Sequence, residues 1–312
     1  MTFLSVTGLS ARYDSSRGSV YAVDDVDFEL EDGESIGIAG ESACGKSTLG
    51  LSIIRMLLGG NATGQILFDG ASLLDMSESD FNDKYRWKKI SMIFQGAMNS
   101  LDPVFIINEQ FNEILKRHNF EGDSKKVIAE AMNSVSLNES VLKKYPHELS
   151  GGMKQRVVIA MALLLKPKFV IADEPTTALD VLIQAQIVNL LKGLKKEGMS
   201  IMLITHDLAV LSEIADKIGI MYGGEIVEFG TSEEIYKNPK HPYTQGLLES
   251  IPKLTGNSPK YIKGIPPSLL DAPTECRFID RCPKAIDKCK QLPPKIKTKT
   301  GYVLCWLYED EK

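Results

Sequence analysis

The sequence predicts an α/β fold with a parallel sheet at its core. Residues Gly40–Thr48 match the phosphate-binding pattern G-x-x-x-x-G-K-[ST] at every fixed position. An apolar strand at 36–39 precedes this loop, and a helical run at 49–58 follows it. A second short apolar run, 169–172, ends in two carboxylates, as expected at the carboxyl edge of a parallel sheet beside a phosphate loop. This order of strand, loop and helix is typical of a nucleotide-binding core.

The residue types of the loop explain how it could bind a nucleotide. Gly40 and Gly45 let the backbone curl so that its N–H groups point inward, and the positive end of the following helix adds to their attraction for phosphate oxygens. Lys46 is expected at the β- and γ-phosphates, and the Ser47 hydroxyl at Mg²⁺. The other expected nucleotide contacts of the loop are Glu41, Ser42, Cys44 and Thr48. Because Cys44 occupies a variable position of the pattern, a catalytic thiol is the less favoured interpretation.

The composition excludes several classes of protein. The 312 residues are 43% hydrophobic and 25% charged, with a formal net charge of −5. This acidic balance, and the lack of a long Lys/Arg block, argue against a nucleic-acid partner. The N-terminus has no basic segment leading into an apolar one, and the most apolar runs are too short to span a bilayer. We therefore expect a cytoplasmic protein that reaches any membrane through partner chains.

The region before the phosphate loop predicts a small sheet. Residues 1–35 alternate polar and apolar side chains, which predicts short strands of an antiparallel sheet beside the core. Tyr13 and Tyr21 both lie upstream of the loop, where an aromatic ring could stack on a purine base. We favour Tyr13, although packing within the sheet explains this ring nearly as well.

The middle of the chain predicts two strands and then a helical segment. Residues 65–70 have the pattern of a strand and a turn, and the run 90–94 predicts a strand that leads into Gln95. From about 96 to 166 the spacing becomes helical, which predicts a helical subdomain inserted into the α/β core.

A polar turn lies near the end of that helical segment. Ser150 could cap a helix there, while Gly151 and Gly152 leave backbone N–H groups exposed at the helix N-terminus. A helix cap without a ligand is the alternative interpretation.

Further polar residues follow the core strands. After the strand at 169–172, one carboxylate of the pair Asp173 and Glu174 could hold a Mg²⁺ shell and the other could polarise water. The loop 178–180 follows and ends at Asp180. A second buried strand, 201–204, leads to His206, which is then well placed to contact a γ-phosphate. Residues 217–230 have the pattern of a hairpin turned by two glycines.

Taken in order, these segments resemble the ATP-binding cassette family. The phosphate loop, Gln95, the Leu149–Gln155 signature, the Asp173-Glu174 strand end, the loop before Asp180 and His206 occur in the family's order. The resemblance covers about residues 1–235 and implies a RecA-like P-loop NTPase core. It implies a core formed by 1–95 and 167–235 with an antiparallel β subdomain, a helical signature subdomain at 96–166, and a small Cys-rich C-terminal extension at 236–312.

The resemblance also implies roles. It implies a head-to-tail dimer in which Ser150, Gly151 and Gly152 of one chain close on the γ-phosphate held by Lys46 of the other, with Asp180 also at the nucleotide. For catalysis it implies Glu174 as the general base, His206 at the γ-phosphate and Gln95 as the reporter of nucleotide state. For Mg²⁺ it implies Ser47, Gln95 and Asp173.

The C-terminal extension points to a sub-family. The segments 241–252 and 264–267 resemble those of ATPase subunits from oligopeptide/dipeptide importers. This implies two membrane permease subunits, a second ATPase that is identical or related, an extracytoplasmic solute-binding protein, and a peripheral location on the cytoplasmic face of the membrane. Import of oligosaccharides by the same machine, and a soluble ABC ATPase without a transporter, are the alternatives.

Four of the five cysteines lie in this extension, with the spacing C-x5-C-x6-C-x15-C. They are Cys276, Cys282, Cys289 and Cys305. In the cytosol, where thiols stay reduced, four thiolates suggest a metal site rather than two disulfides. The spacing does not decide between zinc and iron–sulfur, and four buried thiols without a metal are the alternative. The resemblance favours a [4Fe–4S] cluster that pins a Pro-rich segment with little apolar core of its own.

Overall fold

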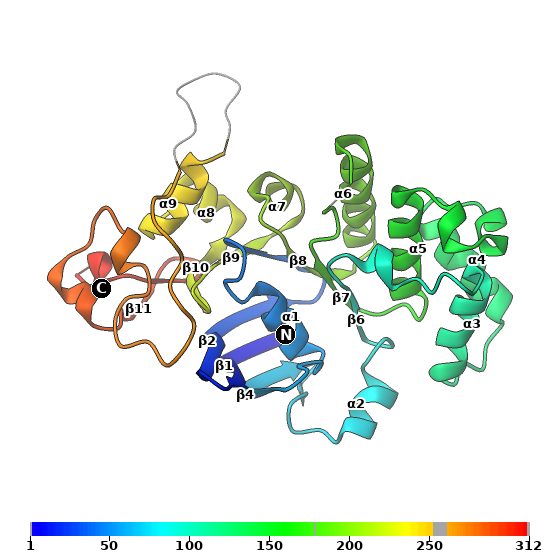
Figure 1. Cartoon of the computed structure of the whole chain (residues 1–312), viewed down its shortest axis with the longest axis horizontal. Helices are drawn as coiled ribbons and strands as arrows, with labels where there is room; N and C mark the ends of the chain where they lie inside the picture. The colour runs from blue at the N-terminus through cyan, green and yellow to red at the C-terminus, as the bar shows by residue number, and fades with distance from the viewer. Residues whose placement is uncertain (1, 178, 252–260, 311–312) are drawn as a thin grey trace. The chain divides into compact units, whose positions relative to one another are not determined.

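The computed structural model describes residues 2–177, 179–251 and 261–310 (Figure 1). They divide into two compact units. Unit 1 contains Met1–Asp75 and Leu203–Lys312, and unit 2 contains Met76–Met202. Each unit is described by itself. In the described part of the chain, no helix combines the length and the apolar character needed to cross a membrane.

Unit 1 begins with an antiparallel sheet of four strands, as the alternation predicted. The order is β2-β1-β4-β5, and β1 and β2 form a long hairpin (Figure 1). The strands are β1 Thr2–Ser15, β2 Gly18–Glu31, β4 Gly60–Phe68 and β5 Ala71–Ser72. The expectation of short strands was wrong, because β1 and β2 each run for 14 residues. Register shifts along the β1–β2 ladder let such long strands twist while they stay paired.

The strand before the phosphate loop belongs to a second sheet. Its order in unit 1 is β11-β12-β10-β9-β3, with β3 parallel to β9 and the other pairs antiparallel. The strands are β3 Ile36–Ala39, β9 Lys217–Tyr222, β10 Glu225–Thr231, β11 Lys295–Lys297 and β12 Tyr302–Leu304. All four residues of β3 are buried, as its continuous apolar run requires. The predicted hairpin is confirmed: Gly223 and Gly224 turn it with φ of +58° and +91°.

The C-terminal extension is part of this sheet. Strand β12 pairs with β10, so that Tyr302 lies opposite Phe229. Ile296, Val303 and Cys305 form a small buried cluster with Tyr308 packed against it. We expected the extension to have little apolar core of its own. Its main support is instead the core sheet, which its strands continue.

The helices of unit 1 are short. They are α1 Lys46–Ile53, α7 Leu208–Ile214, α8 Ser232–Lys237 and α9 Pro242–Glu249, with 3₁₀ turns η4 Ile279–Arg281, η5 Asp287–Lys290 and η6 Trp306–Tyr308. Helix α1 begins three residues earlier than the predicted run 49–58, directly at the phosphate loop, and ends at Ile53. It ends early because Arg55 adopts a left-handed conformation with φ of +55°.

Unit 2 contains the two other parallel strands and most of the long helices. Strands β6 Ile90–Ile93 and β7 Phe169–Asp173 pair in parallel, and the neighbouring β8 Ser200–Ile204 runs across the boundary between the units. The helices are α2 Glu78–Lys84, α3 Ile107–Arg117, α4 Ser124–Ser134, α5 Gly151–Leu163 and α6 Val181–Lys196, with 3₁₀ turns η1 Ala97–Ser100, η2 Glu139–Lys143 and η3 Pro146–Glu148. The helical pattern expected for 96–166 is confirmed. The division into core, helical subdomain and extension stays a prediction.

Candidate functional site

The phosphate loop leaves β3 and enters α1 through a tight backbone path. Gly40 has φ of +155° and Gly45 has φ of +105°, both in the range that favours glycine. A Cβ atom on Gly40 would lie 2.1 Å from the carbonyl oxygen of Met221, and one on Gly45 would lie 2.0 Å from that of Ala22. The loop therefore accepts only glycine at its two ends, because neighbouring backbone fills the space.

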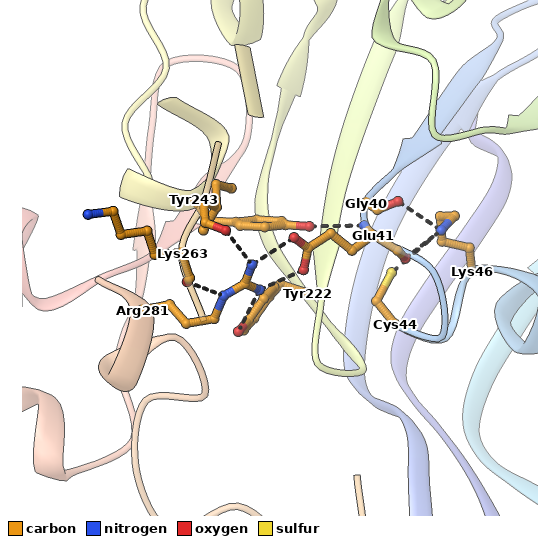
Figure 2. Close-up of polar contacts among 9 residues, drawn as sticks. Gly40, Glu41, Cys44, Lys46, Tyr222, Tyr243, Lys263 and Arg281 are labelled. Atoms are coloured by element: carbon orange, nitrogen blue, oxygen red, sulfur yellow. Dashed lines mark hydrogen bonds and ion pairs between the residues drawn. The ribbon is translucent and has the colours of Figure 1, made fainter. Parts of the chain in front are cut away.

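Lys46 closes the loop from the inside. Its ammonium donates to the carbonyl oxygens of Gly40 at 2.9 Å and Glu41 at 2.7 Å (Figure 2). The side chain is buried, and Lys46 is also the first residue of α1, whose N-terminal amides are free of intrahelical partners. One fixed cation and a helix N-terminus thus meet at the loop, which is the arrangement that attracts an anionic phosphate.

The other predicted loop residues surround this centre. Ser42 is exposed, whereas Ser47 and Thr48 lie half-buried in the first turn of α1. The Cys44 thiol is buried 3.8 Å from the Lys46 ammonium, and burial raises the pKa of that thiol. A raised thiol pKa disfavours the thiolate, which agrees with Cys44 as a packing residue of the loop.

His206 lies on the same cavity as the start of the loop. A cavity of about 560 Å³ in unit 1 is lined by Gly40, Glu41, His206 and Asp207, together with residues of the C-terminal extension. The backbone before His206 is fixed, since Thr205 N–H donates to the carbonyl oxygen of Ile38 at 3.1 Å. Unit 1 therefore brings together the phosphate loop and the predicted γ-phosphate residue.

Tyr13 lies in β1, where its ring limits the space beside Gly60. A Cβ on Gly60 would be 2.7 Å from Cε1 of Tyr13. The neighbouring Tyr21 carries the Arg12 guanidinium 4.3 Å from its ring centre. Stacking of Tyr13 on a base stays a prediction.

Unit 2 brings together the carboxylates at the end of β7 and Gln95 after β6. Asp173, the last residue of β7, is buried. The amide of Gln95 donates to the Glu174 carboxylate at 3.3 Å, and the Thr177 hydroxyl donates to the same oxygen at 2.8 Å. Glu174 has φ of +46°, an uncommon conformation for a residue with a side chain, as strained functional positions often show.

The predicted signature residues form the start of α5 and face α6. The Ser150 hydroxyl caps α5 by accepting from Met153 N–H at 3.4 Å. A Cβ on Gly152 would lie 2.9 Å from Ile183 of α6, so the glycine permits a close approach of the two helices. Asp180 caps α6 by accepting from Ile183 N–H at 3.0 Å. Of the loop 178–180, residue 178 lies outside the described residues.

The four cysteines of the extension are neighbours and carry no disulfide. Cys276 N–H donates to the carbonyl oxygen of Cys289 at 3.0 Å. Burial raises the pKa of Cys276 to about 12 and that of Cys305 to about 11, and in each case neighbouring thiols add to the rise. Within residues 2–177, 179–251 and 261–310, however, no three His, Cys, Asp or Glu side chains are arranged to hold a metal ion.

Comparison with known proteins decides the family. The ABC transporter family pattern matches residues 23–177, and the pattern of the oligopeptide/dipeptide transporter C-terminal region matches residues 227–289. The oligopeptide transport ATP-binding protein AppD of Bacillus subtilis (strain 168) is 45% identical over 99% of this chain and 98% of its own length. This chain belongs to the ABC transporter family. Members of this kind are ATPases that drive transport, and this cassette is such an ATPase of the oligopeptide/dipeptide type.

Other relatives and solved structures agree. The dipeptide transport ATP-binding protein DppD of Caldanaerobacter subterraneus is 42% identical over 98% of this chain and 97% of its own. The dimeric structure of a post-hydrolysis state of the ATP-binding cassette MJ0796 bound to ADP and Pi superposes with a TM-score of 0.65 and 27% identity, covering 73% of this chain and 98% of that one. The predicted P-loop NTPase fold is thereby confirmed.

Two residues of the extension that the sequence did not indicate contact the phosphate loop. The Arg281 guanidinium forms an ion pair with Glu41, and the Tyr243 hydroxyl accepts from Glu41 N–H at 3.0 Å (Figure 2). Local patterns give no signal for either contact, since 240 and 202 residues separate the partners.

Proposed function

We propose that this ATPase is the energy-coupling subunit of an importer that takes up dipeptides or oligopeptides. The observation that carries the proposal is the C-terminal extension, because residues 227–289 match the region characteristic of oligopeptide/dipeptide transporters. The relatives that match nearly the whole chain are oligopeptide and dipeptide transport ATP-binding proteins. No observation favours oligosaccharide import or a role without a transporter.

The site residues support an assignment of roles. Lys46 and the amides of the phosphate loop hold the β- and γ-phosphates of ATP. Glu174 accepts a proton from the attacking water, whose oxygen bonds to the γ-phosphorus while the bond to the ADP oxygen breaks. Gln95 holds the Glu174 carboxylate in place, and His206 supports the γ-phosphate. ATP and water thus become ADP, phosphate and a proton.

The residue types proposed as Mg²⁺ ligands suit this ion. Ser47, Asp173 and Gln95 would hold it, since hydroxyl, carboxylate and amide oxygens are its preferred protein ligands. When bound, it neutralises the negative charge of the phosphate oxygens.

The remaining partners follow from the function. The cassette pairs head to tail with a second ATPase subunit, identical or related, so that the Ser150–Gly152 amides of each chain close on the ATP of the other. Two permease subunits hold this pair at the cytoplasmic face of the membrane, and an extracytoplasmic binding protein delivers the solute. No nucleic acid takes part.

The cysteines of the extension are proposed as ligands of a [4Fe–4S] cluster. The number of the thiols and their proximity support this proposal. In the described residues, however, the thiols are not arranged to hold a metal ion. Iron, zinc and acid-labile sulfide analysis after anaerobic purification tests it. Iron with sulfide is expected, and zinc without sulfide would exclude the cluster.

A substitution at Glu174 tests the catalytic assignment. Glu174→Gln should bind ATP as the wild type does but hydrolyse it at least roughly a hundredfold more slowly, the usual contribution of a general base. Glu197→Gln, at an exposed position after α6, is the matched control and should hydrolyse normally. Near-normal hydrolysis by Glu174→Gln would remove Glu174 from this role.

Isolation of the tagged protein from gently solubilised membranes tests the transport function. We expect two permeases, a second ATPase and a binding protein that carries peptide. A bound oligosaccharide would keep the machine and change its solute. Recovery with ribosomes or nucleic acid and no membrane chains would contradict the importer.

A further inference from the structure

A partly buried ion pair joins the C-terminal extension to the phosphate loop. The Arg281 side chain is only 3% exposed, and its two terminal nitrogens donate to the two oxygens of Glu41 at 2.6 and 2.8 Å (Figure 2). Such a two-pronged pair between a guanidinium and a carboxylate fixes both partners in orientation as well as in distance. Glu41 is the residue of the loop that directly follows Gly40.

The same arginine is fixed on its other side by the extension itself. Its Nε donates to the carbonyl oxygen of Lys263 at 3.0 Å, and Nη1 also lies 3.3 Å from the Tyr222 hydroxyl of β9 (Figure 2). Hydrogen bonding to the Glu41 carboxylate raises the pKa of Arg281. Because its donors are divided between the loop and the extension, the position of one constrains the position of the other.

A second residue of the extension holds the backbone of Glu41. Glu41 N–H donates to the Tyr243 hydroxyl of α9 at 3.0 Å. The Tyr243 ring is fully buried and packs on Tyr222, with 4.5 Å between ring centres, and on Phe278 at 5.3 Å. This hydroxyl is therefore a fixed acceptor rather than a mobile one.

Glu41 is consequently held at three points. Tyr243 receives its N–H, Arg281 binds its carboxylate, and the Lys46 ammonium donates to its carbonyl oxygen at 2.7 Å. Lys46 is the cation at the phosphate site. Glu41 is thus the single residue that links the extension to Lys46, the group that would bind ATP. These contacts leave the backbone at the start of the phosphate loop little freedom to move.

A second arginine of the extension, Arg277, attaches the extension without contacting the phosphate loop, and it therefore serves as a comparison for Arg281. Arg277 is 4% exposed and donates to the Asp24 carboxylate at 2.9 Å, with Glu225 at 3.7 Å. These partners lie in β2 and β10, outside the phosphate loop. Arg277 therefore fastens the extension to the core, whereas Arg281 contacts the nucleotide machinery.

We propose that Arg281 is a positioning residue of the ATP site, which holds Glu41 and thereby the phosphate loop in the conformation that binds nucleotide. The C-terminal extension is then a structural part of the ATP site and not only a marker of the transporter type. The inference rests on the phosphate loop being the nucleotide site, as the proposed function requires.

ATP titration of four full-length variants tests the proposal. We expect Arg281→Gln and Glu41→Gln each to raise the Kd for ATP about tenfold, the effect of losing a hydrogen bond to a charged group. The double variant should bind no more weakly than either single variant, because both substitutions remove one interaction. Arg277→Gln should leave the Kd unchanged even if it lowers the melting temperature.

Hydrogen exchange of the phosphate-loop peptide distinguishes this role from a general loosening of the extension. The Glu41 amide should exchange faster without ATP in Arg281→Gln than in Arg277→Gln at equal loss of melting temperature. Arg281→Lys keeps the charge but not the two-pronged geometry, so its Glu41 amide should exchange at a rate between those of wild type and Arg281→Gln. Arg281→Lys replaces Arg281→Gln in these experiments if Arg281→Gln is unstable.

The outcomes distinguish a failure of the Arg281 inference from a failure of the proposed function. A Kd unchanged by Arg281→Gln or Arg281→Lys overturns the inference alone, as does a double variant whose loss of affinity is the product of the single losses. A wild-type protein that does not bind ATP overturns the proposed function itself.

Discussion

Replacing Phe278 by alanine should lower the free energy of unfolding by about 3–5 kcal/mol, because it weakens the attachment of the extension. Phe278 is 2% exposed, and its ring packs against Tyr222 at 5.1 Å, Tyr243 at 5.3 Å and His241 at 5.7 Å between ring centres. An aromatic side chain buries about 150–250 Å², which corresponds to an upper limit of about 4–6 kcal/mol at 25 cal/mol per Å². Alanine retains part of this area, which lowers the expected loss to the range above.

Urea denaturation of the full-length protein without nucleotide measures this loss. Leu292→Ala is the matched control, because Leu292 belongs to the same extension but is 49% exposed. The control should change the free energy of unfolding by less than about 0.5 kcal/mol. A loss below about 1 kcal/mol for Phe278→Ala would refute the reasoning, since it would mean that the aromatic cluster does not hold the extension to β9.

Two further predictions concern the phosphate loop and pH. Gly45→Ala should abolish ATP binding and lower the melting temperature more than Gly70→Ala does. Both glycines have positive φ, which costs about 1–2 kcal/mol for alanine, but only at Gly45 would the new Cβ meet a backbone oxygen, at 2.0 Å, whereas Gly70 has no neighbour within 4 Å. Equal effects in thermal unfolding and ATP titration would contradict this steric argument. Burial raises the pKa of Glu225 to about 7 against the opposing charge of Arg277. The folded protein therefore holds a proton on Glu225 that the unfolded chain releases above pH 4.5, so this group's contribution to stability falls as pH rises from 4.5 to 7. From pH 5 to 7 the wild type should lose about 2 kcal/mol more unfolding free energy than Glu225→Gln, and parallel pH profiles in denaturant titrations would show that the carboxyl is ionised throughout.

Much of the nucleotide core could be predicted because its signals are local. The continuous apolar run of β3 and the glycines of the phosphate loop identified the strand and its turn, and the carboxylates after β7 identified the end of a second strand. Side-chain period and turn chemistry act over a few residues, so a single stretch of sequence contains the information. The lengths of β1 and β2 were missed because the register shifts that let both strands continue arise only when they pair.

The roles of the site residues required motif order as well as local pattern. Ser150 and Asp180 are ordinary helix caps by their own contacts. Only their position in the order shared with ABC cassettes distinguishes them from the caps of other helices. Their function at the nucleotide stays a prediction.

By itself, the sequence determined that this chain is an ABC cassette with a phosphate loop between a buried strand and a helix. Only the tertiary structure decided that the C-terminal extension continues the core sheet through β12 and that Arg281 holds Glu41. The physical reason is that an ion pair depends on the distance between two atoms in space. Its partners here are 240 residues apart, and no spacing along the chain encodes their meeting.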